Sequence, residues 1–418
     1  MTPEPNSVPH PDHGGTFESL HIRNYRTWFV GALVSNLGGW MQTTALSWVV
    51  LTELTRGDAT MMGLTVSLQF LPQLLLIPLT GRIIDRLDRR RILFFTETAS
   101  GLTSLTIGVL LLTHTMTLSI MLCCAVTAGL ALAFSLPVKQ AFVNDLVRGD
   151  CLVNAVSLNS VQFNMARLAG PALAGVLIGA VGSGWVFVAN AFAFVVLLVA
   201  LGMLRKGEMI PHVVAGVATR LSEAVGYVRR RGDLLVLFAI AGITGAFASN
   251  FAVYASAMAV AFHEPAWGFG LLTSCYAVGS LTGAFLVARQ RVARMKRIAG
   301  AAFLVSMAML ASAMMPNFWL YAATAAIVGF ALITQLATTN AYVQTRTDAL
   351  TRGRVIVIYL AFLNGGLPLG APIIGWIANT WGARSAVALV GGMALLATGI
   401  GVLWLLRTTR SARRRAIA

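Results

Sequence analysis

The sequence predicts an all-α membrane protein with twelve transmembrane helices in two pseudo-symmetric halves of six helices. Three observations support this fold class. Hydrophobic residues make up 57% of the 418 residues and charged residues only 11%, with a mean hydropathy of +0.76, which no soluble fold could bury. The apolar residues fall into twelve long windows, and most basic residues gather in alternate connections between them. The last six windows also repeat features of the first six.

Each window is long enough to cross a bilayer, since about 20 apolar residues span roughly 30 Å of hydrocarbon. In chain order the windows are 28–52, 59–80, 92–113, 116–136, 152–181, 185–204, 234–262, 267–288, 298–315, 318–338, 355–380 and 385–406. The first six form an N-terminal half, 28–204, and the last six a C-terminal half, 234–406. A cytoplasmic segment at 1–27 precedes them and lacks the apolar core of a cleavable signal peptide.

The one long polar connection, 205–233, links the two halves. Within it Leu221, Ala224, Val225 and Val228 recur at helical spacing and lead into a run of three arginines. This pattern predicts an amphipathic helix on the cytoplasmic surface of the membrane, and a plain solvated linker is the alternative.

The basic residues predict the orientation of the chain. If residue 1 lies in the cytoplasm, 28 of the 31 Lys and Arg residues fall in the first segment, the even-numbered connections and a basic tail at 407–418, and two fall in outside loops. Positive residues accumulate on the cytoplasmic side of a membrane. We therefore expect a protein of the bacterial inner membrane with both termini in the cytoplasm. Topology and anionic lipid then explain the net charge of +16, and no nucleic acid is expected as a partner.

The two halves repeat each other at an offset of 200 residues. Ala-Phe-Val at 141–143 matches Ala-Tyr-Val at 341–343, and Gly170, Gly175 and Gly182 match glycines at 370, 375 and 382. Transporters built from such parallel repeats hold their solute near the middle of the membrane, between the halves. The repeat therefore predicts a small-molecule site at the interface between the two halves.

The connection between the second and third windows has a distinctive pattern. It runs Gly-Arg-Ile-Ile-Asp-Arg-Leu-Asp-Arg-Arg-Arg from 81 to 91. It resembles the signature loop of the major facilitator superfamily, Gly-x-Leu-Ala-Asp-Arg-x-Gly-Arg-Arg, and departs from it at Asp88. The resemblance implies a conformational latch formed by Gly81, Asp85, Arg86 and Arg90. A cluster of charges that only sets the topology is the alternative, although the positive-inside rule does not require Asp85.

The fifth window is polar in its first half and rich in small residues in its second. Together with Pro-x-Lys-Gln-Ala at 137–141, it resembles the branch of the superfamily that contains enterobactin-type siderophore exporters and macrolide-efflux proteins. The residues that carry this resemblance are Asn154-Ala155, Leu158-Asn159, Ala166-Arg167, Gly170-Pro171 and Gly175. The resemblance implies export of a bulky amphipathic compound, driven by proton antiport through alternating access. It also implies an exporter motif at Gly170, Pro171 and Gly175, for which close helix packing by small residues is the alternative.

Two ionisable residues within the spans are candidates for function. Arg167 lies deep within the fifth window, where an ion facing lipid costs at least about 2.5 kcal/mol, so it should face a cavity and bind an anionic or oxygen-rich solute. A structural partner for Arg167 is the alternative. Glu97 is a possible proton site in the third window, and a salt bridge to one of the arginines at 89–91 is the favoured alternative.

Neutral polar side chains supply the rest of the candidate substrate cavity, because an amide or phenol in lipid must find a partner. With Arg167 they are Asn36, Gln42, Gln69, Asn159, Gln162, Asn250, Tyr254, Gln335 and Asn364. The sequence contains no nucleotide-binding loop and no cysteine or histidine pattern typical of a metal site, so we expect no cofactor and no metal. The expected partners are a small-molecule substrate, protons and the lipid bilayer, around a monomer.

Three alternatives to an exporter stay open at this stage. A proton-coupled importer of a sugar or carboxylate would predict acidic residues in the first, fourth or seventh window, and none lies there. A non-transporting receptor or assembly protein with the same fold would predict a damaged latch sequence. A membrane enzyme would require a nucleophile with its base, or a metal cluster, and the sequence shows neither.

Overall fold

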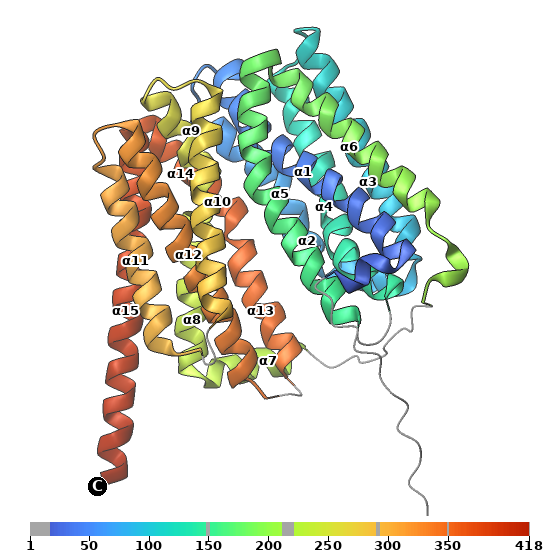
Figure 1. Cartoon of the computed structure of the whole chain (residues 1–418). Coiled ribbons are helices and arrows are strands. Elements are labelled where there is room, and N and C mark those ends of the chain that lie inside the picture. Colours follow the sequence, from blue (N-terminus) through green and yellow to red (C-terminus); the bar gives the residue numbers. More distant parts are fainter. Residues whose placement is uncertain (1–16, 148–150, 211–220, 290–292, 349–350, 418) are drawn as a thin grey trace, which may run out of the picture.

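The chain folds into two helical bundles that lie side by side (Figure 1). The structure is a computed structural model that describes residues 17–147, 151–210, 221–289, 293–348 and 351–417. Within these ranges the side chains at 77–78, 81–82, 84–86, 221–224, 352–353, 357 and 405–417 lie outside the description.

The first half consists of six helices. They are α1 (Arg23–Val49), α2 (Ala59–Arg86), α3 (Arg89–Leu112), α4 (Leu118–Leu146), α5 (Cys151–Val181) and α6 (Ser183–Met203). Local capping explains two of the starts. The carboxylate of Asp58 accepts the backbone N–H groups of Thr60 and Met61, and that of Asp88 accepts the N–H of Arg90. Asp88, the departure from the signature loop, is thus the N-cap of α3.

The second half also has six spans, but two of them are interrupted. Its helices are α8 (Gly232–Ile243), α9 (Phe251–Ala261), α10 (Ala266–Ala288), α11 (Met295–Ala313), α12 (Phe318–Arg346), α13 (Arg352–Gly365), α14 (Leu367–Trp381) and α15 (Ala383–Ile417). A π-helical turn, Thr244–Ala248, separates α8 from α9, and Gly366 separates α13 from α14. The sequence predicts one apolar window for each of these two spans, 234–262 and 355–380. The structure differs, because each span is interrupted near its middle.

The helices have the length and composition of membrane spans. Eleven of the described spans are long and apolar enough to cross a bilayer. With α1, which is 27 residues long and more polar, each half contains six spans. The chain is therefore an all-α, multi-pass membrane protein.

The internal repeat appears in the helix bounds. α4 and α12 begin and end 200 residues apart, and both begin at a capped position, Thr117 and Asn317. Gly182 and Gly382 join the next pair of spans with φ of +94° and +87°, a backbone conformation that glycine adopts without strain. The predicted pseudo-symmetry of the two halves is confirmed at these elements.

One helix is longer than the sequence indicates. The fourth window ends at 136, before Pro137, but α4 continues to Leu146. Lys139, which the sequence analysis places in a cytoplasmic connection, therefore lies inside this helix. Lys139 and Arg167 are both cations within helices of the first half.

The two halves meet mainly at one end of the bundle. We call the end where α2 stops, and where α7 and the C-terminus lie, the basic end, and the other the opposite end (Figure 1). Near the opposite end α2 packs on α14 and α5 packs on α10, because glycines allow the backbones to approach closely. The ribbons of the two halves diverge toward the basic end (Figure 1).

The connection between the halves contains the short helix α7 (Leu221–Arg230), where the sequence predicts an amphipathic helix. Val228 is buried, and Tyr227 packs beside it on residues of α8, α12 and α13. This helix is thus attached to the second half.

Candidate functional site

Arg167 lies between the two halves. It is about halfway along α5, and its guanidinium carbon is 5.5 Å from the centroid of the Trp40 ring on α1. The guanidinium also interacts with the phenol of Tyr276 on α10, in the other half. An arginine over an indole ring gains a cation–π attraction, and the guanidinium donors that Tyr276 does not engage can bind an anion or an oxygen-rich solute.

Aromatic rings from both halves surround this position. Phe163 meets the Trp40 ring edge-on at 5.8 Å, while Phe251 stacks on Tyr276 with the ring centroids 4.3 Å apart. Tyr254 meets Phe251 edge-on in turn. The result is one cation held between aromatic groups of opposite halves, an environment suited to a solute that is partly apolar and partly polar.

A buried ion pair lies within the first half. The Glu97 carboxylate on α3 is 3.0 Å from the Lys139 ammonium group on α4, and the two side chains are 1% and 16% exposed. The hydroxyls of Ser135 and Ser35 donate to the same carboxylate at 2.6 and 3.4 Å. The expected salt bridge from Glu97 to an arginine at 89–91 is therefore wrong, because α4 continues past Pro137 and brings Lys139 to Glu97.

Three of the predicted cavity residues hold helices together instead of facing free space. The side-chain oxygen of Gln42 accepts hydrogen bonds from Ser104 on α3 and Asn190 on α6, within the first half. Asn250 donates to backbone carbonyls of Ala246 and Leu367, and Tyr254 donates to that of Ala248. These bonds satisfy carbonyls beside the interruptions of the seventh and eleventh spans.

Three other predicted amides are buried with atoms that have no hydrogen-bond partner in the described part of the chain. They are Gln69 (Oε1), Gln162 (both atoms) and Gln335 (Oε1). An unpaired buried amide costs about 1–3 kcal/mol, and in native proteins such a group calls for a water or ligand. Asn36 and Asn159 are half-buried, and Asn364 is exposed.

The small residues of α5 bring three helices together. A side chain at Gly170 would collide with Trp40 on α1, and one at Gly175 would press on Gly270 and Ala266 of α10. Pro171 is buried at the same contact, where its carbonyl faces Gly270. The predicted close approach of this span to the other half is present, and it places Arg167 one turn from the contact.

The predicted latch falls largely outside the described residues, because nothing is described at Gly81 beyond its place in α2 or of the side chains of Asp85 and Arg86. Arg90 is described, and one of its guanidinium nitrogens donates to the Gly202 carbonyl at the end of α6. The neighbouring Arg89 forms a 2.6 Å ion pair with Asp145 at the end of α4. The sequence does not predict this pair, because the apolar window of the fourth span ends at 136, before Asp145.

A second set of polar contacts closes the opposite end between the halves. The Asn379 amide near the end of α14 donates to the Asp58 carboxylate at 2.6 Å and to the Thr60 hydroxyl at 2.9 Å. The Asn379 side-chain oxygen accepts the backbone N–H of Ala59 at 2.8 Å. Sequence reasoning missed this contact because its partners lie 321 residues apart and form no local motif.

Comparisons with known proteins agree with this architecture. The sequence profile of the family described as transmembrane secretion effector matches residues 14–416. The nucleoside transporter NupG has the same fold, with a TM-score of 0.69 over 91% of this chain and 98% of NupG at 14% identity. The D-xylose-proton symporter gives a TM-score of 0.70 over 90% of this chain and 97% of the symporter at 12% identity.

Two named relatives align with this chain over different lengths. The chain is 31% identical to the staphyloferrin A transporter of Staphylococcus aureus over 186 residues, 44% of this chain and 46% of that protein. It is 25% identical to the multidrug efflux pump Tap of Mycolicibacterium fortuitum over 394 residues, 90% of this chain and 94% of the pump. The chain thus aligns with about half of the first relative and nearly all of the second. By its family profile and its fold, the chain belongs to the transmembrane secretion effector family of the major facilitator superfamily.

Proposed function

We propose that this protein is a proton-driven exporter of a bulky amphipathic compound, such as a siderophore or a drug, in a bacterial inner membrane. The observation that carries the proposal is Arg167, held between Trp40 of one half and Tyr276 of the other. A solute bound there contacts both halves, as alternating access requires. The names of two relatives, a siderophore transporter and a multidrug efflux pump, support the substrate class.

The distribution of charge supports the orientation. The basic end carries the arginines of the signature loop, of α7 and of the start of α11, and in our proposal it faces the cytoplasm with both termini. In this orientation the hydrogen bonds of Asn379 and the glycine contacts of α2 and α5 lie at the outside end, which supports an inward-facing state in our proposal. A substrate from the cytoplasm or the inner leaflet reaches Arg167 in this state.

The buried ion pair supports proton coupling. Protonation of the Glu97 carboxylate neutralises it and leaves the Lys139 ammonium group without its counter-ion, 3.0 Å away. Because an unpaired ion is costly in a low-dielectric interior, α3 and α4 are expected to shift so that Lys139 reaches a wetter position. Glu97 takes up the proton from one side of the membrane and releases it to the other. The release restores the ion pair with Lys139 and completes the cycle.

Transport by inverted membrane vesicles tests the function directly. Vesicles that contain the protein and are acidified inside are offered siderophores, macrolides and dye-like drugs, with and without an uncoupler. We expect accumulation that the uncoupler abolishes, and no accumulation by vesicles with the Glu97→Gln variant at equal expression. Accumulation that is insensitive to the uncoupler would refute proton coupling. Absence of accumulation for every compound, with folded protein present, would refute the export proposal.

A further inference from the structure

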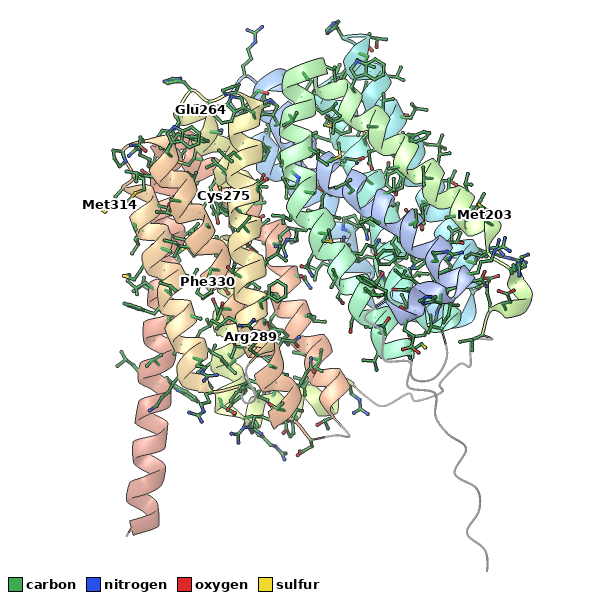
Figure 2. All side chains as sticks on the ribbon, viewed as in Figure 1. Met203, Glu264, Cys275, Arg289, Met314 and Phe330 are labelled. Atoms are coloured by element: carbon green, nitrogen blue, oxygen red, sulfur yellow. The ribbon has the colours of Figure 1, made fainter. Side chains whose placement is uncertain are left out.

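A groove on the surface of the second half, between α10, α11 and α12, has features of a lipid site. The groove has a volume of about 410 Å³. α12 forms its floor with Phe330 and Thr334, and α10 and α11 form its walls with Leu286 and Leu304. Both leucines are more than a third exposed, so the groove is open to the surroundings of the bundle. Figure 2 shows Arg289 toward the basic end of α10 and Phe330 higher in the same half.

The groove exists because of small side chains. Gly300 lies on its α11 wall, and a Cβ atom there would meet nothing within 4 Å. Thr334 occupies the floor, whereas the repeat-related residue of the first half is Phe134, which packs on that half's core. Thr334 is only 8% exposed, and its hydroxyl is buried without a hydrogen-bond partner in the described part of the chain.

Positive charge concentrates at one mouth of this groove. Arg297 lines it, and Arg289, Arg294 and Lys296 are exposed at the adjoining ends of α10 and α11. None of these four residues forms an ion pair with an acidic residue among those described. Lys296 and Arg297 also lie in the first turn of α11, where the helix dipole is positive and no acidic residue compensates it. An anion is the expected neutralising partner.

We propose that this groove binds an anionic phospholipid of the leaflet at the basic end. One acyl chain lies on Phe330 between Leu286 and Leu304, and the phosphate meets Arg297 and its basic neighbours. Apolar walls with a cationic mouth at the depth of the headgroups match a phospholipid in shape and charge. The proposal is independent of the transported substrate.

Native mass spectrometry of the purified full-length protein tests this site. The protein is delipidated and supplied with equal amounts of dioleoyl phosphatidylglycerol and dioleoyl phosphatidylcholine, which differ only in the headgroup. We expect phosphatidylglycerol to be retained preferentially. Arg297→Gln should reduce this preference about fivefold, the effect of one basic residue near an anionic lipid. Arg26→Gln, which removes an exposed arginine of the first half, should leave it unchanged.

A second pair of variants tests the groove itself. Gly300→Leu adds a side chain on the groove wall at a position where a Cβ meets no atom within 4 Å, so it should remove the retained lipid. Gly399→Leu is the matched control, because Gly399 is an exposed glycine of α15 that also meets nothing within 4 Å. Equal retention of the two lipids by the unmodified protein would overturn the anionic specificity. Unchanged retention in Gly300→Leu would overturn the site.

Discussion

The two halves share one architecture but differ in their buried charges. α4 and α12 have the same length and lie 200 residues apart, yet Lys139 of the first corresponds to Thr339 of the second. Lys139 pairs with Glu97, whereas the Thr339 hydroxyl only donates to a carbonyl one turn earlier in its own helix. Likewise, Arg167 of the first half corresponds to Leu367.

This difference separates what folding needs from what transport needs. The second half also forms spans with a threonine and a leucine at these positions, although its eleventh span is interrupted at Gly366, next to Leu367. A helical span at these positions therefore does not require the ions. Each buried ion adds a desolvation cost that a hydrophobic or neutral residue avoids. We infer that the first half keeps Lys139 and Arg167 for function, while the second supplies neutral partners and aromatic surface.

The most severe test makes the first half resemble the second at α4. Lys139→Thr introduces the repeat-related residue and leaves the buried Glu97 without its counter-ion. We expect uncoupler-sensitive transport to fall at least tenfold. The free energy of unfolding should fall by about 3–5 kcal/mol, because one partner of a buried pair is lost. Vesicle transport and thermal unfolding in detergent measure the two effects.

A double variant separates coupling from stability. Glu97→Gln with Lys139→Thr removes both charges, so the melting temperature should return most of the way toward that of the unmodified protein. Coupled transport should stay lost, since no carboxylate remains to take up a proton. Uphill, uncoupler-sensitive transport by this double variant would show that the pair is structural only.

The sequence was sufficient for the fold but not for this pair. Apolar windows, the positive-inside pattern and the repeat predict twelve spans because each signal is local or periodic. The apolar window of the fourth span ends at 136, before Pro137 and Lys139. A hydropathy scale counts every lysine as an isolated ion that is costly in the membrane. The structure removes this cost through Glu97, 42 residues earlier in the chain, and α4 then continues to Leu146. Neutralisation by a distant residue leaves no local trace.

The candidate site, too, could be predicted from the sequence only in part. Arg167 and the small residues of α5 follow from residue type alone, because an ion and a glycine-rich stretch within a span need special surroundings. Which amides face free space does not follow. Gln42 and Gln162 look alike in the sequence, but Gln42 meets Ser104 and Asn190, while the Gln162 amide has no partner among the described residues. Only tertiary packing distinguishes them.

The two glycine contacts between the halves differ in how closely the backbones approach. A side chain at Gly375 of α14 would overlap the Ala59 carbonyl oxygen, whereas one at the repeat-related Gly175 would come to 3.0 Å from the Ala266 carbonyl oxygen. Gly375→Ala should therefore lower the free energy of unfolding by about 1–3 kcal/mol, through overpacking. Gly175→Ala should have a clearly smaller effect in the same thermal unfolding assay. Equal losses would show that α5 and α14 pack with the same tolerance.

Replacing Arg167 by its repeat-related residue tests the substrate site. Arg167→Leu removes the cation over Trp40, an interaction of about 0.5–2 kcal/mol, together with its donors to the solute. We expect KM for an oxygen-rich, anionic solute to rise about tenfold, with little change for a cationic dye. Leu367→Met is the matched control and should leave both values unchanged. A uniform loss for all solutes, with reduced expression, would indicate that Arg167 is structural.

The smallest expected effect concerns the contact that closes the opposite end. Asn379→Ala removes the hydrogen bonds to Asp58, Ala59 and Thr60 but leaves the glycine packing of α2 and α14 intact. A net loss of roughly 1 kcal/mol corresponds to about a fivefold shift toward the state that is open at this end. A cysteine at Ala257, beside a small cavity that Asn379 also lines, reports this shift by its labelling rate in a background without the native cysteines.

The control for this experiment is Thr380→Ala, because the Thr380 hydroxyl bonds only to carbonyls of its own helix. Labelling should be about fivefold faster in Asn379→Ala and unchanged in Thr380→Ala. Equal labelling in all three proteins would mean that glycine packing alone holds this end closed. In that case the contact between the halves would depend on backbone approach at both α5 and α14.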